Sequence, residues 1–386
     1  MDKVRIGIIG IGNMGSAHAR YLFQGDIPGA ELTAVCDTNP ARLQWASETF
    51  GDKVLTFAGA EQLFAAGVVD AVMVATPHYD HPPLAIQAFN HGCHVLCEKP
   101  AGVYTKQVRE MNEAAAKSGK VFSMMYNQRT NPLYQKLRDL VQSGELGPIK
   151  RTNWIITSWY RSQSYYDSGG WRATWAGEGG GVLLNQDPHQ LDLWQWICGM
   201  PVRVRAFCQF GKFHEIEVED DVTAYVEYEN GATGLFVTST GESPGTNRFE
   251  ISADRGKVVV EDGKLTFWRL RVPERQFNRE YKGGFGQPEC WECQIPITGK
   301  ATDHPGITAN WVEAILKGAP LLAPGPEGIR GLELSNAMHL SAWLDNWVDL
   351  PIDEELFHQK LQERIATSTA KKQSGPDRVL SVGGTH

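Results

Sequence analysis

The pattern of apolar and polar residues changes near residue 126. Before that point, short apolar runs without alternation are separated by longer stretches with helical periodicity. Such runs are typical of parallel strands that are buried on both faces, and the stretches between them have the length of crossover helices. The predicted strands are 4–9, 31–36, 54–57, 71–75, 94–97 and 121–125, with helices predicted at 16–22, 40–50, 60–66 and 82–91. The pattern therefore predicts an α/β domain with a doubly wound parallel sheet over residues 1–126.

After residue 126, apolar residues alternate with polar ones, as they do in strands with one covered face. The predicted strands are 151–156, 202–210, 222–229 and 233–240, and the predicted helices are 131–144, 186–198, 307–317 and 328–344. The pairs Asn230-Gly231 and Asp262-Gly263 are typical of type I′ hairpin turns. The pattern predicts an α+β domain over residues 127–365, with an open, mostly antiparallel sheet.

The second face of this sheet has no predicted cover. Alternation around residues 222–228 leaves an apolar side chain such as Tyr225 or Val226 on a face that the first domain cannot reach. We therefore expect a homodimer or homotetramer. Residues 366–386 lack apolar periodicity and are expected to form an extended or disordered tail.

A glycine-rich turn follows the first strand. Gly10, Gly12 and Gly15 have the spacing Gly-x-Gly-x-x-Gly, with Asn13 and Met14 between the last two. In this arrangement the first glycine permits a tight turn, the second admits a pyrophosphate, and the third lets the helix pack on the strand. The turn predicts a Rossmann-type dinucleotide site.

The second strand ends at Asp37, at the distance from the glycine turn that the dinucleotide fingerprint requires. A carboxylate there accepts hydrogen bonds from a ribose 2′-hydroxyl and repels a 2′-phosphate. Arg42 is a nearby cation, but it follows Pro40, which is expected to open a helix. NAD is therefore favoured over NADP.

Composition narrows the class of protein. The chain has 386 residues, of which 42% are hydrophobic and 21% charged, and this is enough for two domains with separate cores. A net charge of -8 without a basic block argues against nucleic acid or an anionic membrane as a partner. We see neither a signal peptide nor a membrane span, and the seven cysteines are odd in number and scattered. We expect a cytoplasmic protein.

The pair Cys290 and Cys293 forms a Cys-x-x-Cys motif. A structural zinc site would need a second pair of ligands, and His304 is the one candidate downstream. We expect no metal.

Glu98-Lys99-Pro100 stands directly after the predicted strand 94–97. Ligands of open α/β sheets bind outside the carboxyl ends of the strands, so Lys99 is expected to point toward the nicotinamide end of the cofactor. A solvated Glu-Lys pair that caps the strand is the alternative.

A second candidate cluster begins with the triple glycine at residues 179–181. Asn185 and His189 follow, four residues apart, and share a face if one helix contains both. His189 is the natural proton carrier, because an unperturbed imidazole has a pKa of about 6.5. Asp187 and Asp192 lie beside it, and a structural role for the histidine is the alternative.

The third cluster is aromatic. Residues 159–175 carry six aromatic side chains and two arginines: Trp159, Tyr160, Tyr165, Tyr166, Trp171, Trp175, Arg161 and Arg172. Aromatic faces stack on sugar rings, and arginine donors bind hydroxyls or carboxylates; core packing explains any single tryptophan equally well. His304 stands before a later helix and is another candidate for the same cleft.

Together these residues resemble the Gfo/Idh/MocA family of sugar and polyol oxidoreductases. The resemblance extends to about Glu363 and rests on the glycine turn, Ala75-Thr76-Pro77 with His81, Glu98-Lys99-Pro100, the triple glycine with His189, and Asn310-Trp311. It implies a Rossmann domain followed by an open sheet that commonly forms a dimer, with NAD or NADP between them, and it implies that Lys99 and His189 are catalytic. The expected cofactor contacts are Gly10, Gly12, Asn13, Met14, Gly15, Asp37, Thr76, Pro77, His81, Glu98, Lys99 and Asn127. The expected substrate contacts are Tyr160, Trp171, Arg172, Asn185, Asp187, His189 and His304.

One position departs from the family pattern. Many members carry aspartate where this chain has Asn185. A neutral amide can orient a substrate hydroxyl but cannot act as a base, and Asp187 is a candidate substitute whose spacing from His189 points it elsewhere.

The predicted function is NAD-dependent oxidation of a secondary ring hydroxyl in a sugar, glycoside or cyclitol. His189 is expected to take the hydroxyl proton and Lys99 to stabilise the developing alkoxide. Oxidation at C3 of a glycoside is favoured because the aromatic segment has room for an aglycone. One alternative is a redox-neutral, glycoside-processing enzyme that recycles bound NAD, and another is a non-catalytic dinucleotide sensor.

Overall fold

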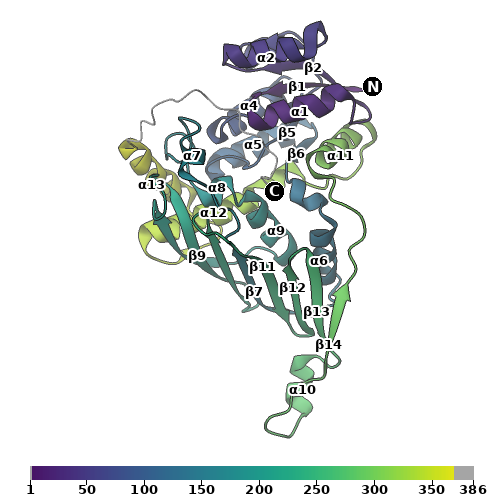
Figure 1. Ribbon diagram of the computed structural model, residues 1–386, viewed down its shortest axis with the longest axis vertical. Coiled ribbons are helices and arrows are strands. Elements are labelled where there is room, and N and C mark those ends of the chain that lie inside the picture. Colours follow the sequence, from purple (N-terminus) through teal and green to yellow (C-terminus); the bar gives the residue numbers. More distant parts are fainter. Residues whose placement is uncertain (1, 369–386) are drawn as a thin grey trace.

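The computed structural model describes residues 2–368 and contains two sheets that follow one another along the long axis of the molecule (Figure 1). The first sheet is parallel, with the strand order β3-β2-β1-β4-β5-β6. Its strands are β1 (Val4–Ile9), β2 (Ala30–Cys36), β3 (Leu55–Phe57), β4 (Ala71–Val74), β5 (His94–Cys97) and β6 (Phe122–Met124). Its helices are α1 (Asn13–Gln24), α2 (Pro40–Phe50), α3 (Ala60–Ala65), α4 (His81–Asn90) and α5 (Thr105–Ser118). The predicted doubly wound sheet is confirmed, and each predicted strand lies within two residues of the observed one.

The central strands of this sheet are buried because helices cover both faces. Ile6, Val72 and Val95 have no exposed surface. The chain crosses from one side of the sheet to the other between β1 and β4, and in folds of this kind the ligand crevice opens at this switch point. The sheet topology alone therefore places a ligand site next to the glycine turn after β1.

The second sheet has nine strands in the order β14-β13-β12-β11-β7-β10-β9-β8-β15. They are β7 (Ile149–Ile156), β8 (Arg203–Phe210), β9 (Glu219–Glu227), β10 (Thr233–Ser239), β11 (Asn247–Ala253), β12 (Gly256–Glu261), β13 (Lys264–Leu270), β14 (Cys290–Ile295) and β15 (Val348–Asp349). Most neighbours are antiparallel, as predicted, but β7 and β10 pair in parallel. They do so because the chain leaves β7 through a long helical excursion before it returns to the sheet.

Two local predictions within this sheet have different outcomes. At Asp262-Gly263 both residues have positive φ, as a type I′ turn requires. At Asn230-Gly231 the prediction of a type I′ turn is wrong, because Gly231 takes a positive φ and Asn230 does not. The Asn230 side chain instead accepts a hydrogen bond from the backbone N–H of Ala232 at 2.9 Å.

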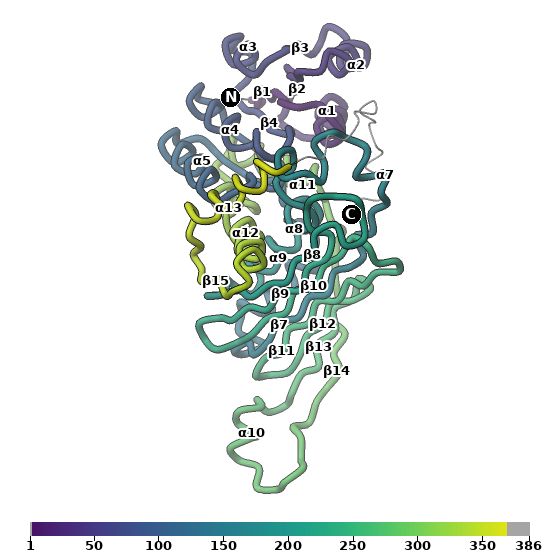
Figure 2. The backbone as a smooth tube through the Cα atoms, turned by 90° about the vertical axis from the view of Figure 1, so that its left-hand side faces the viewer, coloured from purple at the N-terminus to yellow at the C-terminus, as the bar shows by residue number. Residues whose placement is uncertain are grey.

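Helices pack on one face of the mixed sheet and leave the other open (Figure 2). They include α6 (Pro132–Gln142), α8 (Val182–Asn185), α9 (Pro188–Cys198) and α12 (Gly328–Leu344). Val226 faces these helices and is fully buried, whereas Tyr225 is 37% exposed on the open face. Of the two alternatives named for the uncovered face, Tyr225 is therefore the one that lies there.

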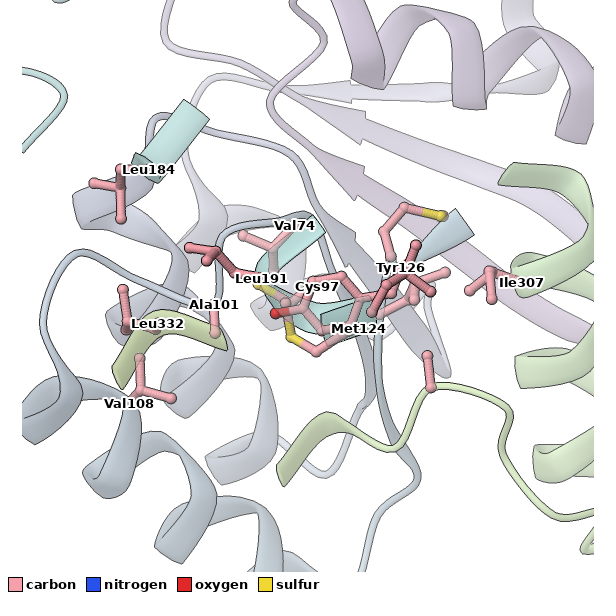
Figure 3. Packing of buried hydrophobic residues seen from close by; sticks show 14 of the residues in the cluster. Val74, Cys97, Ala101, Val108, Met124, Tyr126, Leu184, Leu191, Ile307 and Leu332 are labelled. Atoms are coloured by element: carbon pink, nitrogen blue, oxygen red, sulfur yellow. The ribbon is translucent and has the colours of Figure 1, made fainter. Parts of the chain in front are cut away.

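The chain after the mixed sheet returns to the first domain. Helix α11 (Asp303–Lys317) packs against α1, β1 and β5, and Ser123 of β6 forms a β-bridge with Pro324. Residues from both domains share one apolar cluster at this junction, with Val74 and Cys97 on one side and Leu191 and Leu332 on the other (Figure 3). The elements that border the crevice are therefore fixed by a common core.

The α-helices that were not predicted are α7 (Gln163–Tyr166), α8, α10 (Glu274–Glu280) and α13 (Glu354–Thr367). Helix α10 projects beyond the sheet in Figure 1. The predicted tail begins too early, because its first two residues, Ala366 and Thr367, belong to α13. The rest of that prediction, from residue 369 onward, lies outside the described residues. Within residues 2–368, no helix combines the length and the apolar character that a membrane span needs.

Candidate active site

A cleft of about 1440 Å³ opens at the carboxyl edge of the parallel sheet, between the two domains. Its walls come from the ends of β1, β2, β4 and β5 on one side, and from the segment that leads into α9 on the other. Ligand pockets commonly enclose about 300–1,000 Å³, so this cleft has room for a dinucleotide and a small substrate together.

The glycine turn has the geometry that a pyrophosphate requires. Gly10 has a φ of +88°, and a Cβ on Gly15 would lie 1.9 Å from the carbonyl oxygen of Gly10, so neither position admits a side chain. Gly12 lines the cleft, and a Cβ there would meet nothing within 4 Å. The turn leads directly into α1, whose N-terminus presents backbone N–H groups to the cleft.

Asp37 stands at the end of β2 and lines the same cleft. Its Oδ2 accepts a hydrogen bond from the Ile11 N–H at 2.8 Å, and its Oδ1 accepts one from the Asn39 N–H at 2.9 Å. The carboxylate is therefore held in place by the turn that it borders. Arg42 also lines the cleft, donates from Nε to the Ile11 carbonyl at 2.7 Å, and packs over Trp45.

Polar groups gather where β4 and β5 end. The two ring nitrogens of His81 lie 2.8 Å from the Thr76 carbonyl oxygen and 2.7 Å from that of Pro100, which ties the two strand ends together. Thr76 and Pro77 line the cleft, and the Thr76 Oγ1 is buried without a hydrogen-bond partner in the described part of the chain. An orphaned hydroxyl in a cleft of this shape fits a polar ligand such as NAD.

Glu98 is buried at the end of β5 and contacts the ring of His18, with 2.7 Å between Oε1 and Nε2. Burial alone would raise the pKa of the Glu98 carboxyl, but the hydrogen bond and charge of His18 outweigh burial and lower it to about 2. Tyr21 extends this contact, because its hydroxyl lies 2.9 Å from the His18 Nδ1 and 2.8 Å from the Thr308 Oγ1 on α11. Glu98 is thus an ionised group fixed by the first domain and by the returning helix.

Lys99 follows directly and reaches across the cleft. Its Nζ donates a hydrogen bond to the backbone carbonyl of Asn185 at 2.9 Å. Burial lowers the pKa of the Lys99 ammonium, while the charge of Glu98 opposes that shift. The lysine is therefore a fixed cation at the substrate end of the cleft, and no carboxylate of residues 2–368 forms an ion pair with it.

His189 lies in the first turn of α9 and lines the cleft with an exposure of 8%. The condition under which Asn185 and His189 would share a helix face, a single helix that contains both, is not met. Asn185 is the last residue of α8. The helix is interrupted after it, and α9 begins at Pro188. Both side chains line the cleft nevertheless, because the two short helices follow one another along its wall.

An aromatic and cationic wall faces Lys99. Tyr165 stands between two guanidinium groups, with the Cζ of Arg172 at 4.7 Å and that of Arg161 at 5.2 Å from its ring centroid. Trp171 and Trp159 complete this wall. Arg161, Tyr165 and Trp159 were named in the sequence as part of an aromatic cluster but not as substrate contacts, because the cluster alone does not tell which of its side chains face inward.

Most of the residues expected at the site line this cleft. On the cofactor side they are Gly10, Gly12, Asn13, Met14, Asp37, Thr76, Pro77, His81, Glu98 and Lys99, and on the substrate side Trp171, Arg172, Asn185, His189 and His304. Cleft residues that the sequence did not single out include His78, Gln186 and Asn39. No sequence signal distinguished these three from ordinary polar residues near a turn.

Four expected residues do not line the cleft. Gly15 packs behind the turn, Tyr160 is 52% exposed elsewhere, and Asp187 is fully buried. Burial raises the pKa of the Asp187 carboxyl well above its usual range, so Asp187 is poorly suited to replace a charged group at position 185. Asn127 is also fully buried, and both polar atoms of its side chain lack a hydrogen-bond partner within the described residues.

Two other candidates serve the fold. Asp192 binds the buried Arg129 through two hydrogen bonds of 2.6 and 2.8 Å, so its carboxylate is engaged away from His189.

Cys290 and Cys293 lie on β14, where side chains three residues apart point to opposite faces of the sheet. Their Cα atoms are about 10 Å apart, which is too far for a disulfide. Among residues 2–368, no group of three or more His, Cys, Asp or Glu side chains is placed to hold a metal ion.

Comparison with known proteins identifies the family. Residues 4–126 match the model of an oxidoreductase family with an NAD-binding Rossmann fold, and residues 134–259 match the model of the GFO/IDH/MocA C-terminal domain. The chain belongs to the GFO/IDH/MocA oxidoreductases. It is therefore an NAD-binding oxidoreductase, and the parallel sheet, the glycine turn and Asp37 are the parts of this family member that fit the cofactor.

Several relatives are dehydrogenases of carbohydrates or inositol. D-glucoside 3-dehydrogenase of Escherichia coli is 32% identical over 260 residues, which cover 62% of this chain and 70% of the relative. Inositol 2-dehydrogenase of Rhizobium meliloti is 24% identical over 339 residues, which cover 86% and 95%. Among solved structures, the WlbA dehydrogenase of Chromobacterium violaceum in complex with NADH and UDP-GlcNAcA has a TM-score of 0.77 and 29% identity, with 92% of this chain and 97% of that chain covered.

Proposed function

We propose that this oxidoreductase oxidises a secondary ring hydroxyl of a sugar, glycoside or cyclitol. The observation that carries the proposal is the convergence of Lys99 and His189 on one cleft with the glycine turn and Asp37. A dinucleotide site alone would need only the turn and the carboxylate. The fixed cation and the imidazole beyond them are the groups that an alcohol oxidation needs.

In the proposed reaction, His189 takes the hydroxyl proton while the C–H bond of the carbinol carbon breaks and a carbonyl forms. Lys99, held by the Asn185 carbonyl, stabilises the negative charge that develops on the oxygen. NAD supplies the acceptor for the hydride when it is bound. The cleft residues Trp159, Tyr165 and Trp171 offer aromatic faces on which a sugar ring packs.

Within this class, a glycoside oxidised at C3 is the substrate we favour. The support is the likeness to a D-glucoside 3-dehydrogenase together with the aromatic wall, which has apolar surface for an aglycone. The test is a screen of NAD reduction at 340 nm with monosaccharides, inositols and aryl glycosides. Reduction with at least one of them supports the proposal. NAD binding with neither NAD reduction nor consumption of any of these compounds contradicts it in favour of a sensor.

A redox-neutral enzyme that recycles bound NAD is the second candidate. It would consume an aryl glycoside and release the aglycone without net NADH. The same screen, with the aglycone followed by its own absorbance, separates this candidate from a dehydrogenase that releases a keto-glycoside.

We further propose that the protein works as a homo-oligomer in the cytoplasm. The open face of the mixed sheet carries exposed aromatic residues such as Phe207 and Tyr225, which a second copy would cover. All seven cysteines are free thiols, as is usual for proteins of a reducing compartment.

A further inference from the structure

A buried carboxyl group lies directly behind the substrate end of the cleft. Glu178 is 2% exposed and precedes the triple glycine. Its Oε1 accepts a hydrogen bond from the Nδ2 of Asn185, and its Oε2 accepts one from the backbone N–H of Ala173. Glu178 itself does not line the cleft, whereas Asn185 does. The carboxyl group therefore acts on the cleft through Asn185.

The contact determines which way the amide of Asn185 points. Burial raises the pKa of the Glu178 carboxyl, while the charge of Arg172 and the hydrogen bonds from Ala173 and Asn185 oppose that shift. Both carboxyl oxygens act as acceptors in this geometry, so the amide presents its NH2 group to Glu178. The Oδ1 of Asn185 then faces the hydroxyl of Tyr165, which lies 3.5 Å away. That hydroxyl already accepts hydrogen bonds from the Arg172 Nη1 at 2.9 Å and from the Gln186 Nε2 at 3.3 Å, so its own proton is directed to Asn185.

These hydrogen bonds form one chain with a single direction. Donors begin at Arg172 and Gln186, pass through Tyr165 and Asn185, and end at the acceptor oxygens of Glu178. Reversal of any member would place two donors or two acceptors face to face in a buried site, which costs about 1–3 kcal/mol. The negative end at Glu178 therefore sets the orientation of the whole chain.

Residue 185 also holds the catalytic lysine, but through a different atom. The Lys99 Nζ donates to the backbone carbonyl of Asn185, and side-chain substitutions at position 185 leave that carbonyl in place. The side chain and the backbone of residue 185 thus have separable roles. A substitution that changes only the side-chain amide should therefore alter substrate recognition and keep the hydrogen bond that Lys99 donates to the backbone of residue 185.

We propose that Glu178 is a positioning residue that fixes the amide of Asn185 with its Oδ1 toward the cleft, so that residue 185 accepts a hydrogen bond from a substrate hydroxyl. The inference rests on the proposed function, since its kinetic readout needs a sugar or cyclitol as substrate. It adds to that function a requirement for a hydroxyl, rather than a methoxy or deoxy group, at the position that meets Asn185.

The experiment transposes the carboxyl group between the two positions. Glu178→Gln removes the charge and one of the two acceptor oxygens, so the side chain can no longer accept from both Ala173 and Asn185. We expect kcat/KM to fall about 10-fold, mainly through a higher KM for the sugar, with the Kd for NAD unchanged. Asn185→Asp sets two carboxyl groups against one another, and we expect a fall of about 100-fold. In the double variant Glu178→Gln/Asn185→Asp, the glutamine NH2 faces the new carboxylate, and activity should recover at least 10-fold over Asn185→Asp alone.

The matched control is Glu215→Gln combined with Asn185→Asp. Glu215 is an exposed residue, so this variant removes the same charge without touching the amide, and no recovery is expected. Additive effects of Glu178→Gln and Asn185→Asp would overturn the inference, as would an unchanged KM in Glu178→Gln. If Glu178→Gln does not fold, Asn185→Ala gives the decisive measurement, because it keeps the carboxylate and should raise the KM for the sugar; an unchanged KM overturns the inference.

The failure of the proposed function would be recognised separately. If the wild-type protein oxidises no sugar or cyclitol, the proposed function fails, and the coupling between positions 178 and 185 is then measured in melting temperatures without substrate. Non-additive melting temperatures in the double-variant cycle support the positioning contact, and additive ones overturn it.

Discussion

Asp37 uses both carboxylate oxygens to hold backbone N–H groups of the turns beside it, Ile11 on one side and Asn39 on the other. Asp37 also lines the cleft. A ribose hydroxyl would therefore donate to a carboxylate whose orientation the two backbone N–H groups already fix. We therefore expect position 37 to combine a structural contact with cofactor selection, and a substitution must be chosen to separate the two.

We predict that Asp37→Asn raises the use of NADP relative to NAD by about 10-fold or more, because the amide keeps one acceptor oxygen while the charge that repels a 2′-phosphate is lost. Arg42 remains in the cleft to attract the phosphate. Asp37→Ala should show the same change in preference together with weaker binding of both cofactors. Comparison of kcat/KM for NAD and NADP measures it, and an unchanged ratio in both variants would remove Asp37 as the selector.

We predict a bell-shaped pH–rate profile. The rate should rise with pH as the imidazole of His189 loses its proton and becomes able to accept one. It should fall again at alkaline pH, because burial lowers the pKa of Lys99 and the cation is lost at a lower pH than in an exposed lysine. His189→Ala should flatten the acid limb, and Lys99→Arg, which keeps its charge, should remove the alkaline limb.

The same variants separate catalysis from binding. Lys99→Ala and His189→Ala should each lower kcat by about 10²–10⁴-fold and leave the Kd for NAD, followed by fluorescence, within a small factor of wild type. A His189→Ala enzyme with near-normal turnover and an intact acid limb would exclude His189 as the base.

The place of an individual side chain could be predicted where a short motif fixes both its position in the fold and the direction in which it points. Lys99 follows a buried strand, so the end of that strand places it in the cleft without further knowledge. Asp187 and Tyr160 were placed by proximity in sequence, and the structure puts both outside the cleft lining because the chain turns between neighbouring residues there. Glu178 had no signal at all, since a glutamate before glycines reads as an ordinary exposed residue.

Among the elements, parallel strands were the easiest to predict, because burial on both faces leaves an uninterrupted apolar run. Strands β11 to β14 were not predicted from the sequence, although the turn at Asp262-Gly263, which joins β12 to β13, was predicted. Consecutive apolar residues interrupt the alternation there: Val258, Val259 and Val260 in β12 and Phe267 and Trp268 in β13. The break between α8 and α9 was missed because Pro188 is favourable in the first turn of a helix and gives no sign that another helix ends just before it.

We predict that the turn before α8 does not accept a side chain. A Cβ on Gly181 would lie 2.0 Å from the backbone oxygen of Glu219, so Gly181→Ala must move α8 or β9. We expect a loss of about 1–3 kcal/mol in the free energy of unfolding and a fall in kcat/KM, because Asn185 ends the displaced helix. Gly170→Ala is the control, since a Cβ there meets nothing within 4 Å. Thermal melting and steady-state kinetics measure both effects, and equal behaviour of the two variants would contradict the prediction.

At the scale of the whole molecule, the open face of the mixed sheet is the best candidate for a subunit interface. Phe207 is 55% exposed and Tyr225 is 37% exposed on neighbouring strands. We predict a homo-oligomer at micromolar concentration by sedimentation, and dissociation in the double variant Phe207→Glu/Tyr225→Glu, because opposed copies would then bring carboxylates together. Phe285→Glu, at the far arm near α10, is the control. A monomeric wild-type protein would exclude the oligomer.

The late return of the chain to the first domain has a consequence for hybrids made by recombination. The edge strand β6 is completed by residues that follow more than 190 positions later: the Met124 N–H and the Ser123 hydroxyl both donate to the carbonyl of Ala323, at 3.0 and 2.8 Å. In a hybrid that joins two relatives near residue 126, β6 would come from one relative and the segment around Ala323 from the other. Their contact would then be mismatched, although residue 126 is a natural domain boundary in the sequence. A crossover pair that exchanges residues 157–181 leaves this closure intact and replaces one wall of the cleft. Such an exchange would change the aromatic wall of the cleft alone, while the cofactor half and the C-terminal segment that completes β6 stay together.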